Sequence, residues 1–159
     1  MGSYRIAPEL AVSEWLNAAE PITLASLRGK VIVMNVFQMH CLGCIHHSMP
    51  LAKRLYDSFD SAEVSVLGLH TVFESHDAAT PAALAAFVLE QDLRFPIGID
   101  KQPPDNGLPL TMRAYGMQGT PTTILIDTVG RIRMQRFGAS DVSTLFASID
   151  ILIDEARAG

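Results

Sequence analysis

The feature that most constrains the fold is a nearly continuous apolar run that is followed closely by two cysteines. Residues 31–37, Val-Ile-Val-Met-Asn-Val-Phe, are rich in β-branched side chains. Such a run predicts a strand that is buried on both faces, as in a sheet covered by helices on each side. Cys41 and Cys44 come next, and a helix is expected from about Cys41 to Ser58, kinked by Pro50. The cysteine pair is therefore predicted to lie where a buried strand ends and a helix begins.

The rest of the chain alternates between strand and helix patterns. We predict further strands at 64–69, 95–99, 122–126 and 131–137, and helices that begin at Thr80-Pro81, near 111–115 and after Ser140 or Asp141. Residues 1–29 are expected to form an irregular lead-in, and Ile132 and Met134 are expected to share one face of the last strand. This order predicts a single α/β domain over 1–159, whose mixed sheet has parallel crossovers first and an antiparallel hairpin last.

The composition limits the classes of protein to which the chain can belong. Of its 159 residues, 48% are hydrophobic and 18% are charged, which is typical of a compact globular protein. The formal net charge of -5 argues against nucleic acid as a partner, because a phosphate backbone requires a basic surface. No apolar stretch is long enough to span a bilayer, and no signal peptide is seen. We therefore expect no membrane partner and a cytoplasmic location, unless a leader has been trimmed from a periplasmic protein.

The spacing of the two cysteines, C-x-x-C, indicates either a redox pair or half of a metal site. At a helix N-terminus, unpaired N–H groups and the helix dipole stabilise an anion, and the thiolate is the nucleophilic form of cysteine. We therefore expect Cys41 to be the attacking thiol and Cys44, one turn further in, to be the resolving thiol. The redox group is then a Cys41–Cys44 disulfide, with no other cofactor and no metal. The alternative is a pair of unreactive core cysteines.

A second motif lies far along the chain, where Gly-Thr-Pro-Thr occupies 119–122. Together with residues 29–37, the cysteine pair and Tyr-Gly-Met at 115–117, it resembles the thioredoxin-like superfamily, and more closely its TlpA/ResA-like or AhpC/TSA-like redoxin branch. The resemblance implies a thioredoxin-like fold with an N-terminal extension and an inserted αβ segment, and the activity of a thiol–disulfide oxidoreductase. It also implies that Pro121 is cis and packs beside the cysteines, and that the backbone of Thr120 pairs with the substrate.

The chain departs from the family pattern around the cysteines. The usual tryptophan before the first cysteine is replaced by Met39-His40, and the dipeptide between the cysteines is Leu-Gly instead of the Gly-Pro of thioredoxin. The buried acid of thioredoxin is replaced by Asn35, which cannot act as a base. The reduction potential of a relative therefore does not transfer to this chain.

Histidines surround the cysteine pair. His40 is a candidate for stabilising the Cys41 thiolate, and His47 for accepting the proton of Cys44. His46 is a weaker candidate, and the alternative for all three is a solvated helix surface. No role is assigned to His70 or His76.

Two other functions use the same residues. A peroxiredoxin has a threonine three residues before its reactive cysteine and a proline seven before, where this chain has Gln38 and Met34. A non-enzymatic metal module would use the sulfur and nitrogen ligands of Cys41, Cys44, His40 and His47. For the favoured oxidoreductase we expect a protein or small-molecule disulfide or dithiol as the partner, with the direction of the reaction and the oligomeric state left open.

Overall fold

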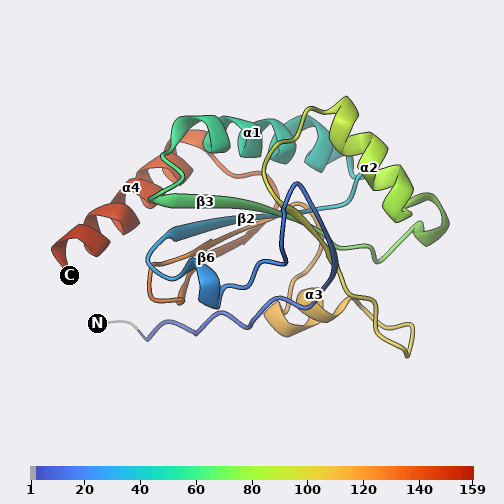
Figure 1. The fold of residues 1–159 in the computed structure, drawn as a ribbon, viewed down its shortest axis with the longest axis horizontal. Coiled ribbons are helices and arrows are strands. Elements are labelled where there is room, and N and C mark those ends of the chain that lie inside the picture. Colours follow the sequence, from blue (N-terminus) through green and yellow to red (C-terminus); the bar gives the residue numbers. More distant parts are fainter. Residues whose placement is uncertain (1–2) are drawn as a thin grey trace.

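A six-stranded mixed sheet forms the centre of the computed structural model, which describes residues 3–159 (Figure 1). Its strands are β1 (Val12–Leu16), β2 (Val31–Phe37), β3 (Val64–His70), β4 (Ile97–Asp100), β5 (Thr122–Ile126) and β6 (Ile132–Phe137). They lie in the order β1-β4-β3-β2-β5-β6. β2, β3 and β4 run parallel, whereas β1, β5 and β6 pair antiparallel with their neighbours. The predicted mixed sheet is confirmed, including the hairpin at its end.

Helices cover both faces of the sheet. They are α1 (Met49–Ser58), α2 (Pro81–Glu90), α3 (Leu110–Tyr115) and α4 (Val142–Ala158), with short 3-10 turns at Ala25–Leu27 and His76–Ala78. In Figure 1, α1, α2 and α4 lie on one side of the sheet, and α3 lies on the other side with the N-terminal segment. Thr80 and Asp141 cap α2 and α4 with their side chains, which confirms the predicted helix starts. Within residues 3–159, no helix is long and apolar enough to cross a membrane; the expected cytoplasmic location stays a prediction.

The β2 strand is apolar along its length because its two faces contribute to two different cores. Val31, Val33 and Phe37 pack toward α1, α2 and α4. Ile32, Met34 and Val36 pack toward α3 and the N-terminal segment. The strand is also hydrogen-bonded to β3 on one edge and to β5 on the other. Both edges and both faces of β2 are therefore in contact with other elements. These contacts fix the position of its end, where the segment that carries the cysteines starts.

The segment 1–29 contains a strand that the sequence analysis did not identify. β1 pairs antiparallel with β4 and forms one edge of the sheet. Its five residues are exposed or only half-buried, so the sequence lacks the alternation of buried and exposed positions that predicts a strand. The pairing with β4, which is distant in the sequence, makes this segment a strand.

The helix after the cysteines begins as predicted, but not as a regular α-helix. Helical structure runs from residue 42 to 58, and its part at Cys44–Ser48 is a π-helical turn that leads directly into α1. Pro50 is the second residue after this turn. A proline has no N–H to donate and its ring crowds the preceding turn of an α-helix. The wider π-helical turn accommodates both effects. The kink expected at Pro50 stays a prediction.

β6 contains a β-bulge where it pairs with β5. Leu125 pairs with Met134, whereas the next residue, Ile126, pairs with Ile132, so Arg133 is the extra residue. Ile132 accordingly packs in the core near α3, and Met134 packs in the core near α4. The prediction that these two side chains share a face was wrong, because an extra residue in one strand reverses the alternation.

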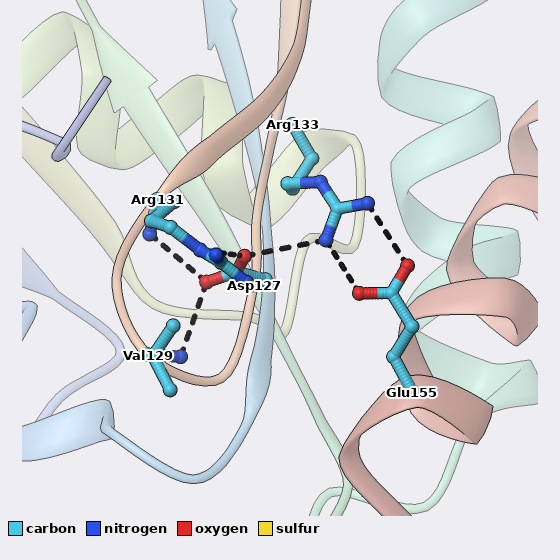
Figure 2. Close-up of polar contacts among 5 residues, drawn as sticks. All are labelled: Asp127, Val129, Arg131, Arg133 and Glu155. Carbon is cyan, nitrogen blue, oxygen red and sulfur yellow. Dashed lines mark hydrogen bonds and ion pairs between the residues drawn. The ribbon is translucent and has the colours of Figure 1, made fainter. Parts of the chain in front are cut away.

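A cluster of charged residues joins the β5–β6 hairpin to α4 (Figure 2). The buried carboxylate of Asp127 accepts hydrogen bonds from the N–H groups of Val129 and Arg131, at 3.1 and 2.9 Å, and from the Arg131 side chain at 2.8 Å. Arg133 lies 3.4 Å from the same carboxylate and makes two bonds to Glu155 of α4, at 2.6 and 2.9 Å. Burial opposes the ionisation of Asp127, but the hydrogen bonds outweigh it and lower the pKa of that carboxyl.

We expect Arg133→Gln to lower the free energy of unfolding by about 1–2 kcal/mol, because the variant loses the link between the hairpin and α4. The measurement is urea denaturation at neutral pH. Arg136→Gln is the control, since Arg136 is exposed on the same strand and belongs to none of these contacts. Equal losses in the two variants would show that the cluster contributes nothing specific.

Candidate active site

Cys41 and Cys44 lie at the start of the helix that follows β2. Both are free thiols. The Cys44 thiol donates a hydrogen bond to the sulfur of Cys41 at 2.7 Å, and the backbone N–H of Cys44 donates to the same sulfur at 3.2 Å. Cys41 is partly exposed, whereas Cys44 is fully buried. Burial, and then the hydrogen bond to Cys41, raise the pKa of the Cys44 thiol to about 12. The geometry therefore makes Cys41 the accessible sulfur and Cys44 a protonated thiol behind it.

The Thr120–Pro121 segment lies against the cysteine pair. The peptide bond between these two residues is cis, as the resemblance implies. The Cys41 thiol lies 3.6 Å from the carbonyl oxygen of Thr120 and donates to it. Gly43, between the cysteines, faces Pro121 so closely that a Cβ atom there would lie 3.3 Å from the proline Cδ. The fold thus brings together the two motifs that the sequence analysis singled out.

Gln38 connects three segments of the site, and the sequence analysis considered it only as the residue in place of a threonine. Its side chain is buried. The amide oxygen accepts the N–H of Phe73 at 3.2 Å, and the amide nitrogen lies 3.4 Å from Glu74 and 3.5 Å from the Thr120 hydroxyl. Gln38 therefore links the turn before Cys41 to the loop after β3 and to the segment before β5. A polar residue between a buried strand and a cysteine pair was the only sequence signal for this role.

A cavity of about 140 Å³ opens beside Cys41. Its lining includes His40 and also Glu74 and Ser75, which come from the loop after β3. The His40 ring is exposed, and its Nε2 lies 3.3 Å from the carbonyl oxygen of Ala78. Cys41 thus faces a cavity that carries both an imidazole and a carboxylate. Glu74 was missed in the sequence, because the loop that carries it is joined to the site only by the fold.

His46 and His47 lie elsewhere. They line a different cavity, of about 250 Å³, together with Arg54 and Ser140. Among residues 3–159, no three histidine, cysteine or acidic side chains are grouped so that they could hold a metal ion. The set considered for a metal module is thus divided between two cavities, with His40 beside Cys41 and His47 away from it.

Asn35, at the position of the buried acid of thioredoxin, is fully buried in β2. β2 packs against the π-helical turn that begins with Cys44. Within the described part of the chain, neither polar atom of the Asn35 side chain has a hydrogen-bond partner. The position retains its burial but not the proton acceptor of thioredoxin.

His70, to which the sequence analysis gave no role, lies directly beneath the turn that carries Cys41. It is the last residue of β3, it is only 1% exposed, and its ring lies 5.1 Å from that of Phe37. Its Nε2 accepts the backbone N–H of Met39 at 3.3 Å. Burial, and then the nearby His40, lower the pKa of His70 to about 4. His70 is therefore neutral at physiological pH, with Nε2 as an acceptor and the ring proton on Nδ1.

A family model described as the AhpC/TSA family matches residues 5–135. The chain belongs to this family. A curated relative, the thiol-disulfide oxidoreductase ResA of Bacillus thuringiensis (strain Al Hakam), is 30% identical over 133 residues, which cover 83% of this chain and 68% of ResA. Protein DipZ of Mycobacterium tuberculosis (strain CDC 1551 / Oshkosh) is 27% identical over 96% of this chain, but the match spans only 21% of DipZ.

Solved structures confirm the thioredoxin-like fold. A protein described as a member of the thioredoxin-like superfamily is 49% identical, with a TM-score of 0.91 and coverage of 94% of this chain and 96% of that chain. A thiol-disulfide isomerase from Corynebacterium glutamicum is 42% identical, with a TM-score of 0.88 and coverage of 92% and 96%. The predicted family and fold class are therefore correct.

The pKa of His70 predicts a dependence of stability on pH. Between pH 6.5 and pH 4, the unfolded chain binds a proton at this residue that the folded chain does not bind. The folded state should therefore lose up to about 3 kcal/mol of stability from His70 as the pH falls through this window. His70→Gln, which cannot titrate, should have a flatter profile than the wild type in urea denaturation from pH 4 to 7. His76→Gln, at an exposed position, should retain the wild-type slope; a wild-type slope in His70→Gln as well would contradict the prediction.

Proposed function

We propose that this chain is a thiol–disulfide oxidoreductase in which Cys41 is the attacking thiol and Cys44 the resolving thiol. The observation that carries the proposal is the unequal burial of two sulfurs that lie 2.7 Å apart. Cys41 is partly exposed and can reach a substrate, whereas Cys44 is buried within reach of Cys41. Membership of the AhpC/TSA family and the similarity to ResA and to the Corynebacterium isomerase support the same chemistry.

The reaction is an exchange of two electrons between the cysteine pair and a substrate disulfide. The Cys41 thiolate attacks one sulfur of the substrate, forms a mixed disulfide, and releases the other substrate sulfur, which takes up a proton. Cys44 then loses its proton and attacks the Cys41 sulfur, so that the Cys41–Cys44 disulfide forms and the second substrate thiol leaves. The substrate disulfide is reduced and the cysteine pair is oxidised, and the reverse sequence oxidises a dithiol. The cysteine pair is the only redox group that this scheme requires.

The surroundings of Cys41 support distinct roles for its neighbours. The Cys44 N–H and the start of the helix stabilise negative charge on the Cys41 sulfur. The backbone of Thr120, whose carbonyl lies beside that sulfur, positions the substrate chain, with Pro121 packed below it. His40 tunes the thiolate from the adjacent cavity. His47 faces the other cavity, so a role in accepting the Cys44 proton rests on the sequence argument alone.

The surface around Cys41 favours a polypeptide disulfide as the substrate. Leu42 is 70% exposed, directly after the attacking cysteine, and Phe137 is 52% exposed. The Phe137 ring lies against Gly119, next to the segment that contains Thr120. Exposed apolar side chains beside a reactive group are typical of a surface that contacts another protein.

The contacts of Gln38 do not support the peroxidase alternative. This residue stands where a peroxiredoxin has its threonine, and its amide is occupied by contacts with Phe73, Glu74 and Thr120. A disulfide exchange reaction requires no pocket for a peroxide, so it fits the site as it is.

We expect Cys44→Ser to trap mixed disulfides on Cys41, because the resolving step is lost, and Cys41→Ser to abolish the reduction of insulin disulfides. Mass spectrometry identifies the trapped species, and insulin turbidity reports the activity. The serine variants serve as controls for each other, since each retains one cysteine. Full insulin reduction by Cys41→Ser would rule out the assigned order of attack.

We expect His40→Ala to slow the alkylation of Cys41 at pH 6 by about two- to fivefold, because a charged imidazole near a thiolate stabilises it by a fraction of a kcal/mol to about 1 kcal/mol. The rate is measured with iodoacetamide on the reduced protein. His46→Ala is the control, because His46 is also exposed but lines the other cavity. Equal rates for both variants at pH 6 mean that His40 does not tune the thiolate.

A further inference from the structure

Two backbone N–H groups of the turn that carries Cys41 have partners inside the protein. The N–H of Cys41 donates to the carbonyl of Gln38 at 3.0 Å and closes the turn. The N–H of Met39 points away from the turn and donates to Nε2 of His70 at 3.3 Å. Met39 is only 5% exposed, so little of this residue is open to solvent. A buried N–H without a partner is costly, and the histidine ring is the acceptor that the fold supplies.

The position of the His70 ring is determined by the sheet. His70 and Phe37 are register partners on the parallel strands β3 and β2, and their rings lie 5.1 Å apart. Both residues end their strands, and both are buried. Packing against Phe37 therefore fixes the ring independently of the turn. The ring presents its acceptor to Met39, which lies two residues before Cys41.

We propose that His70 is a positioning residue for Cys41, and that its neutral imidazole holds the turn at Gln38–Cys41 by accepting the N–H of Met39. The role requires an acceptor at Nε2, which only a neutral ring with its proton on Nδ1 provides. The burial of the ring maintains that form. The proposal rests on the proposed function for its biological meaning, but it concerns only the reactivity of the Cys41 sulfur.

The position of the turn matters because the Cys41 sulfur has close partners on two sides. The Cys44 N–H lies 3.2 Å from it and the Thr120 carbonyl 3.6 Å. A shift of the turn changes the stabilisation of the thiolate and the alignment of the Cys41 sulfur with Cys44. Displacements of about 1 Å at a reacting atom can change rates by about a hundredfold. Support from β3 thus bears on both the attack by Cys41 and the resolution by Cys44.

The test compares His70→Phe with His70→Gln. Phenylalanine retains an aromatic ring beside Phe37 but removes the acceptor, whereas glutamine supplies an oxygen near the position of Nε2. Two quantities are measured on folded, fully reduced protein: the rate of Cys41 alkylation by iodoacetamide, located by mass spectrometry, and the equilibrium constant of the Cys41–Cys44 couple with glutathione. We expect His70→Phe to change each by about tenfold or more, and His70→Gln by less than about threefold. His76→Phe, at an exposed position, should leave both unchanged.

The outcomes separate the proposal from its alternatives. A His70→Phe variant that unfolds at a lower temperature but retains the wild-type rate and equilibrium constant would overturn the proposal, because the role is then structural only. A wild-type protein whose Cys41 is alkylated but which never reduces insulin would contradict the proposed function and leave the His70 comparison valid. If His70→Phe does not fold, nitrogen-15 NMR of the wild type decides. An Nδ1–H tautomer with Nε2 hydrogen-bonded to the Met39 amide supports the proposal, and an Nε2–H tautomer overturns it.

Discussion

β2 is hydrogen-bonded on both edges, and both of its faces are buried in cores that different helices complete. A slip of this strand by one residue would move each of its side chains into the other core, where the packing does not fit it. Cys41 follows its end by only a few residues. The location of the nucleophile, at the centre of one end of the sheet, is thus a consequence of the packing of a strand that contributes no chemistry of its own.

Three segments meet at this end of the sheet, and buried polar side chains hold them together. Gln38 joins the turn before Cys41 to the loop after β3 and to Thr120. His70 supports the same turn from the end of β3. Networks of buried polar groups that have found partners define one arrangement more sharply than apolar packing does. In this molecule, the network fixes the arrangement in which the accessible Cys41 sulfur lies beside the cis-proline segment Thr120–Pro121.

Burial alone gives the two identical cysteine side chains different roles. They are separated by one helical turn and they share a hydrogen bond. Cys44 is enclosed by the core beneath the helix, and its thiol therefore retains its proton. Cys41 lies at the rim of a cavity that an imidazole and a carboxylate also line. The relatives that share the fold are named for disulfide chemistry, and the unequal exposure of the pair is the structural basis for assigning that chemistry here.

By itself, the sequence determined most of the elements and the two motifs, because both are encoded locally. Apolar periodicity indicated β2 and the helices, and turn and capping residues such as Thr80 and Asp141 marked where elements begin. Only the tertiary structure decided that β1 is a strand, that Ile132 and Met134 face different cores, and that His40 and His47 line different cavities. It alone also revealed His70, Gln38 and Glu74 as parts of the site. These features depend on which residues become neighbours across the sheet, and the register of β2 against β3, unlike a periodic pattern, is established only when the whole core packs.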